Sequence, residues 1–213
     1  QAGGRHRRPV PVSALRRLFS AAAQNASGNS YHHAGHFAHV VMAAGLLATL
    51  AGLRCEDRRL LVLAGLVHDL AHQGRRASSR HYHQERLSAR RAVRVISGCG
   101  GDMRLALRVH RLVLATALTI DANRSNILKS DWLARLLTDA DIFGSVLYPR
   151  NRSIEMTRAL KLEQRLPGPA TEVNRRFAEM IGATGLQSDL AQAMLQTALG
   201  SRHSTRNAVR LSD

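Results

Sequence analysis

The sequence predicts an all-α fold, a compact bundle of several helices. Almost every long segment places apolar residues three and four positions apart, which is the spacing of an amphipathic helix. No segment combines β-branched residues with strict alternation, and no internal repeat is visible. With 213 residues, of which 45% are hydrophobic, the chain can bury one sizeable core without stabilising disulfides.

Periodicity predicts three helices in the first third of the chain, over residues 9–23, 31–53 and 56–72. The turn-rich stretch QNASGNS separates the first two. Two acidic residues open the third helix, where they complement the helix dipole, and Gly74 provides a stop.

Glycine and proline divide the rest of the chain, with GCGG and Pro149 as the clearest breaks. The remaining helices are predicted over residues 84–97, 101–118, 130–146, 152–165 and 170–199, the last interrupted at 182–185. We expect a basic N-terminal segment with the first helix over 1–24, one catalytic domain over 25–200 and a basic tail over 201–213.

The net charge of +16 raises the question of a nucleic-acid partner. Lys129 and Lys161 are the only lysines, so 31 − 2 = 29 of the basic residues are arginine, a bias that coding composition explains as readily as a binding surface. Aromatic residues make up only 4% of the chain, which leaves few stacking platforms for single-stranded bases. We therefore expect a small-molecule partner rather than a nucleic acid, with a homodimer as an option.

The hydropathy pattern does not favour a membrane protein. The longest apolar run, Val40–Leu53, is shorter than the roughly 20 residues that span a bilayer. Arg16 and Arg17 break the only stretch that resembles a signal peptide. Cys55 and Cys99 lie in no metal-binding spacing, so we read them as reduced thiols of a cytoplasmic protein.

Histidines are concentrated in the first half of the chain, where eight of the 11 lie between residues 32 and 83. In GLVHDLAHQG, His68 and Asp69 interrupt a run that otherwise looks fully buried. Burying a carboxylate costs several kcal/mol unless it is paired or binds a metal. His68 and His72 are expected four residues apart on one helix face, with Asp69 on the adjoining flank.

Two further segments carry polar residues of the same kind. His32 and His36 are four residues apart in the second predicted helix, and Asp139 and Asp141 interrupt an apolar stretch that starts at Trp132. Asp139 can equally face solvent or form a hydrogen bond within its own helix. Imidazoles and carboxylates from facing helices form metal sites in bundle cores, so we predict such a site here.

Four motifs in this order resemble a known family: YHHAGH, HDLAHQG, LVLATALTID and DADIFG. The His, His-Asp and Asp pattern resembles the HD superfamily of metal-dependent phosphohydrolases. More narrowly, the motifs resemble the catalytic domain of the class I 3′,5′-cyclic-nucleotide phosphodiesterases over residues 31–145. The resemblance implies an HD-domain bundle with a metal site in its helical core.

The resemblance also implies a role for each matching residue. The implied ligands of the first metal are His36, His68, Asp69 and Asp141. Asp69 would bridge to a second metal that water otherwise holds. His32 matches the general acid that protonates the leaving ribose oxygen, and His72 and Glu85 match positions that orient water at the metals.

Other positions depart from the family pattern. His33 replaces an asparagine, and Ala117 replaces the aspartate that ends the LATD motif. No clear counterpart exists for the glutamine and phenylalanine that hold the purine, so Gln187, Gln192 and Gln196 are only candidates. The metal centre is therefore better supported than cyclic-nucleotide specificity.

The ligand types indicate the chemistry independently of the family. Mixed histidine and carboxylate ligation suits Zn, Fe or Mn at the first site, and carboxylate with water suits Mg or Mn at the second. Two such cations would generate a bridging hydroxide that attacks phosphorus. Arg75, Arg76 and Arg80 could hold substrate phosphate, or could equally face solvent as loop residues.

These inferences lead to one predicted function and three alternatives. The prediction is a metal-dependent phosphodiesterase that converts a 3′,5′-cyclic nucleotide of the cAMP or cGMP type to the 5′-monophosphate. The alternatives are a nucleotide phosphomonoesterase or dNTP hydrolase of the wider HD group, an inactive HD module for regulation or interaction, and a basic nucleic-acid-binding protein. A monoesterase has less use for the acid His32, which favours the diesterase.

Overall fold

The computed structural model describes residues 12–25, 28–74, 83–117, 122–146 and 150–197. These residues form helices and turns with no strand, so the predicted all-α fold is confirmed for the described chain. A short helix over 189–197 follows the last labelled one. The labelled helices are α1 (Val12–Asn25), α2 (Ala34–Leu50), α3 (Cys55–Val67), α4 (His83–Gly98), α5 (Met103–Ala115), α6 (Ala122–Ser130), α7 (Trp132–Val146), α8 (Arg150–Gln164) and α9 (Ala170–Thr184).

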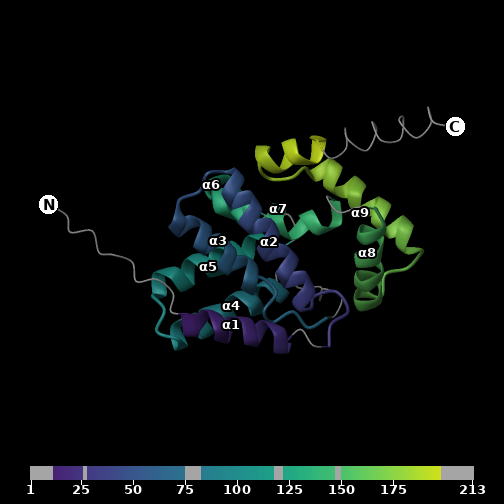
Figure 1. Ribbon diagram of the computed structural model, residues 1–213. Helices are drawn as coiled ribbons and strands as arrows, with labels where there is room; N and C mark the ends of the chain where they lie inside the picture. The colour runs from purple at the N-terminus through teal and green to yellow at the C-terminus, as the bar shows by residue number, and fades with distance from the viewer. Residues whose placement is uncertain (1–11, 26–27, 75–82, 118–121, 147–149, 198–213) are drawn as a thin grey trace.

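The core lies among α2, α3, α5 and α7, which pack against one another at the centre of the molecule (Figure 1). Its fully buried side chains include Leu47, Leu61, Leu112 and Leu136. α1 adds Leu18 to the same core and packs on α3 and α4. α8 and α9 pack against each other beside α7, at the right of Figure 1. None of the described helices has both the length and the apolar character needed to cross a bilayer.

The predicted helix over 56–72 was too long at its C-terminal end. α3 ends at Val67, and the following residues form a turn in which His72 N–H donates to the Asp69 carbonyl at 2.9 Å. His68 and His72 therefore do not occupy one helix face. In this turn the backbone hydrogen bonds join residues three positions apart instead of four, which brings the Asp69 and His72 side chains to the same side of the chain.

The predicted helix over 130–146 begins instead at Trp132, and a separate helix, α6, precedes it. Asp131 separates the two because its carboxylate accepts hydrogen bonds from Leu133 N–H and Ala134 N–H. Such an acceptor satisfies the free donors at a helix start. The Arg108 guanidinium donates to both carboxylate oxygens, at 2.6 and 3.2 Å.

The predicted interruption near 182–185 is present, and it explains Asp139. α9 ends at Thr184, and the following residue, Gly185, has a left-handed φ of 72°. Asp139 is buried in α7 and accepts hydrogen bonds from Gln187 N–H at 2.6 Å, Ser188 N–H at 2.9 Å and the Ser188 hydroxyl at 2.6 Å. Burial raises the pKa of Asp139, while these hydrogen bonds oppose the rise. Asp139 thus anchors the start of the last helix and does not face solvent.

Candidate metal centre

Four residues from three helical segments converge in the core. Single ligand atoms of all four lie within 4.8 Å of one another, and they belong to His36, His68, Asp69 and Asp141. The Nε2 atoms of the two histidines are 3.1 Å apart. Asp69 Oδ2 lies 3.0 Å from His68 Nε2, and Asp141 Oδ1 lies 3.3 Å from each imidazole Nε2.

Each side chain is positioned by its own element. His36 is buried on α2, and Asp141 comes from α7, the helix that packs beside it. His68 is the C-cap of α3 and is fully buried. Its Nδ1–H donates to the Gly65 carbonyl at 2.7 Å, which leaves Nε2 to face the cluster. Fixing one ring nitrogen in this way is how proteins orient a ligating histidine.

The charges at the centre are strongly interdependent. Burial by itself lowers the pKa of His36 and His68, but the Asp69 and Asp141 carboxylates outweigh burial and raise the pKa of both histidines. Burial opposes ionisation of the two aspartates, yet the histidines hold the pKa of each carboxyl below its usual range. The buried cluster therefore favours positive charge at its centre.

This donor set fits a divalent cation. Two imidazole nitrogens and two carboxylate oxygens converge from buried positions, and in this arrangement a cation replaces the protons that the imidazoles would otherwise carry. Such a mixture of nitrogen and oxygen ligands suits a transition metal better than Ca²⁺, which takes oxygen ligands alone.

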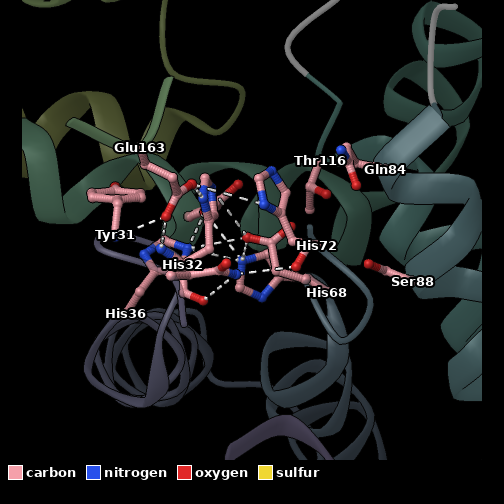
Figure 2. Close-up of polar contacts among 12 residues, drawn as sticks. Tyr31, His32, His36, His68, His72, Gln84, Ser88, Thr116 and Glu163 are labelled. Carbon is pink, nitrogen blue, oxygen red and sulfur yellow. Dashed lines mark hydrogen bonds and ion pairs between the residues drawn. The ribbon is translucent and has the colours of Figure 1, made fainter. Parts of the chain in front are cut away.

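A second group of ligand atoms shares Asp69 with the first. It consists of His32, Asp69 and His72. The rings of His32 and His72 are stacked with centroids 3.6 Å apart, and His32 Nε2 lies 3.6 Å from Asp69 Oδ2 (Figure 2). Among the described residues, Asp69 is therefore the one that both groups share.

Glu163 is a site residue that sequence reasoning missed. It lies near the end of α8, its side chain is 2% exposed, and its carboxylate binds His32 Nδ1 (Figure 2). The other carboxylate oxygen accepts hydrogen bonds from Tyr31 N–H at 2.8 Å and His32 N–H at 3.0 Å. Burial alone would raise the pKa of Glu163, but these contacts lower it to about 2. Nothing in the stretch KLEQRLPG distinguishes this glutamate from a surface one.

His72 is held as a neutral ring. Burial lowers its pKa to about 4. Gly74 N–H donates to its Nδ1 at 3.2 Å, which makes Nε2 the protonated nitrogen. The Asn29 amide donates to the carbonyls of both His32 and His72 at 3.1 Å, so it joins the two segments that carry these rings.

Side chains of α4 form hydrogen bonds with the backbone of the turn that follows His68. The buried Ser88 hydroxyl accepts from Ala71 N–H at 3.1 Å, and Gln84 accepts from Gln73 N–H at 3.3 Å. Glu85, on the same helix, is half-buried. Burial raises the pKa of Glu85, and the negative charges of the site aspartates raise it further.

Several other predicted residues lie away from the centre or outside the described chain. The Gln187 and Gln192 amides donate to nearby carbonyls, those of Gly185 and Leu186. Gln196 is exposed on the last helix. The arginines proposed to hold phosphate, at positions 75, 76 and 80, are outside the described residues.

Comparison with known proteins identifies the family. A sequence model of the HD domain matches residues 36–144, which is more than half of the chain and includes all four residues of the buried cluster. The chain belongs to the HD-domain family. This family groups the protein with the metal-dependent phosphohydrolases, and the buried His and Asp cluster lies within the matched residues. A search of curated proteins finds no match.

Proposed function

We propose that this HD-domain protein is a phosphodiesterase that hydrolyses a 3′,5′-cyclic nucleotide to the 5′-monophosphate. The observation that carries the proposal is the position of His32. Its imidazole lies between the buried Glu163 carboxylate on one side and the His36, His68, Asp69 and Asp141 cluster on the other. That is the arrangement of a general acid beside a phosphate site.

The reaction requires a nucleophile and a proton for the leaving oxygen. His36, His68, Asp69 and Asp141 would hold the divalent cation, which when bound would activate water as the nucleophile near neutral pH and neutralise charge on the phosphoryl oxygens. Glu163 accepts from His32 Nδ1–H, so the other nitrogen, Nε2, faces Asp69 and the substrate. As the bond between phosphorus and O3′ breaks, His32 Nε2–H gives its proton to O3′.

The two stacked histidines have different roles in this proposal. His72 has a pKa of about 4, so it stays neutral near neutral pH and does not serve as the acid. Its Nε2–H remains as a hydrogen-bond donor, which in this proposal orients water or a phosphoryl oxygen. Glu163 acts on His32 rather than on His72, because its carboxylate is in direct contact with the His32 ring, whereas His72 Nδ1 lies 3.9 Å from it.

An apolar pocket supports a nucleotide as the substrate. The pocket has a volume of about 200 Å³ and is lined by residues of α8 and α9, by Leu166 between these helices and by Tyr31. The Tyr31 ring centroid is 4.8 Å from the ring centroids of His32 and His36. Phe177 and Val173 give the pocket aromatic and aliphatic walls of the kind that hold a nucleobase.

The test compares two phosphodiesters that differ in their need for an acid. The O3′ of cAMP or cGMP is a poor leaving group, whereas p-nitrophenolate leaves without protonation. His32→Ala should lower kcat for the cyclic nucleotide by about 10²- to 10⁴-fold and change hydrolysis of bis(p-nitrophenyl) phosphate much less. His33→Ala is the matched control because His33 is exposed and its ring accepts a hydrogen bond from Gly35 N–H, away from the cluster residues.

Metal dependence is tested in the same assay. Hydrolysis should require added Mn²⁺ after chelation and should be lost in Asp69→Ala. Activity on monophosphates or dNTPs alone would favour the wider HD group, and bound metal with no hydrolysis would favour a regulatory module. Equal losses for both diesters in His32→Ala would contradict its role as the acid.

A further inference from the structure

A second pocket borders the metal centre on the side of α4. It has a volume of about 320 Å³. Its lining includes Asn29, His72, Gln73, Leu87, Arg91 and Arg94. Arg91 and Arg94 bring two positive charges and Gln73 a side-chain amide donor, and no carboxylate of the described residues lines the pocket. This pocket, called the arginine pocket below, is therefore suited to an anion.

The two arginines are presented together by the geometry of α4. Leu87, Arg91 and Arg94 are spaced at i, i+4 and i+7, so they share one face of the helix. Both arginines are exposed, and neither forms an ion pair with a carboxylate within the described part of the chain. Two unpaired guanidinium groups on one face provide the planar donors that phosphate oxygens accept.

His72 connects the arginine pocket to the metal centre. Its ring belongs to the group formed with His32 and Asp69, and it also lines the pocket. The scissile phosphate has to lie at the cluster, so an anion in the arginine pocket is a different group, separated from the first by the His72 ring. The Asn29 amide holds the carbonyl of His72 and lines the pocket as well, which fixes this separation.

We propose that the same centre also cleaves short linear nucleotides, and that the arginine pocket binds their second phosphate, one nucleotide linkage away from the phosphodiester that is cleaved. This inference rests on the proposed phosphodiesterase function and extends it. Cyclic mononucleotides, which have one phosphate, use only the metal centre. Nucleotides that carry a second phosphate, such as a 5′-phosphorylated dinucleotide, also engage Arg91 and Arg94.

The size of the pocket limits the ligand to a short one. Arg91 and Arg94 are one helical turn apart, which matches a single phosphate and not a track of several. Leu87 offers a sugar or base an apolar edge on the same helix face. A short phosphorylated nucleotide therefore fits this surface better than a long nucleic acid, whose affinity depends on many phosphate contacts.

The experiment compares the thymidine dinucleotides TpT and pTpT, which differ only in a 5′-phosphate. With the Mn²⁺-loaded full chain, kcat/KM for pTpT should exceed that for TpT by about tenfold, the effect of one charge-assisted contact. The double variant Arg91→Ala with Arg94→Ala should remove this preference, mainly by raising KM for pTpT. Its hydrolysis of bis(p-nitrophenyl) phosphate should be unchanged.

The control variant carries the same loss of charge elsewhere on the surface. Arg90→Ala with Arg104→Ala removes two exposed arginines of α4 and α5 that do not line the pocket, and it should keep the preference for pTpT. Equal kcat/KM for the two dinucleotides in the unmodified protein would overturn the inference. A preference that survives in the Arg91 and Arg94 variant, or that is lost equally in the control, would also overturn it.

Failure of the proposed function gives a different result. In that case no diester is hydrolysed, including bis(p-nitrophenyl) phosphate, and titration calorimetry replaces kinetics. Tighter binding of pTpT than of TpT, lost in the Arg91 and Arg94 variant, would support the subsite without any hydrolysis. Equal binding of the two would reject it.

Discussion

Replacing Glu163 by glutamine removes the charge that faces His32 while keeping the size of the side chain. The pKa of Glu163 falls from its usual 4.5 to about 2 in the folded protein. That difference corresponds to about 3 kcal/mol of interaction with the ionised carboxylate. Glutamine keeps an oxygen for one backbone N–H but loses the charged contact with the imidazole. We expect the Glu163→Gln substitution to lower the free energy of unfolding at pH 7 by about 2 to 3 kcal/mol.

The pH dependence gives the sharper test. Because the folded-state pKa is below the unfolded-state value, the carboxylate contributes stability above about pH 4.5, and the contribution is lost as the pH falls toward 2. At pH 3.5 this carboxyl is largely protonated in the unfolded chain. The difference in unfolding free energy between the native protein and the variant should therefore be smaller than at pH 7 by about 1.4 kcal/mol. Urea unfolding of the native protein and the variant at both pH values measures this.

A neighbouring glutamate on α8 provides the control. The Glu155 side chain is 56% exposed and pairs with Arg152 at the surface, so Glu155→Gln should change the free energy of unfolding by less than about 0.5 kcal/mol at either pH. Two results would refute this reasoning. The first is a Glu163→Gln variant with the same free energy of unfolding as the native protein, and the second is a difference between the two proteins that is as large at pH 3.5 as at pH 7.

Three other predictions concern the core and the metal centre. Asp139→Ala should cost about 2 to 4 kcal/mol in urea unfolding because it leaves buried donors unpaired, whereas Asp102→Ala, at the exposed start of α5, should cost about 1 kcal/mol. Gly74→Ala should destabilise the protein more than Gly52→Ala. Both glycines have a left-handed φ, 62° at Gly74 and 63° at Gly52, so both substitutions strain the backbone. At Gly74, but not at Gly52, the added Cβ atom would also lie 2.2 Å from a side-chain oxygen. The melting temperatures of the two variants measure the difference. Adding Mn²⁺ to chelator-treated protein at about 100 times its Kd should raise Tm by about 5 to 10 °C, and Asp69→Asn should abolish the rise; an unchanged Tm would argue against a cation at the cluster.

The sequence by itself determined the fold class and the residues of the buried cluster. Helical periodicity is a local property, so most helices and the break before the last one could be predicted. His36, His68, Asp69 and Asp141 stand out because a polar side chain in an apolar helix must be paired or bound, whatever packs beside it. That requirement can be read without knowing the partner.

Only the tertiary structure decided which groups complete the site. Glu163 meets His32 across 131 positions of the chain, through the packing of α8, and a lone glutamate in a polar helix carries no local signal of that contact. The turn at Asp69 and the pocket that Arg91 and His72 both line depend in the same way on how α4 packs. Periodicity reports which face of a helix is buried, whereas the identity of the neighbour is set by long-range packing.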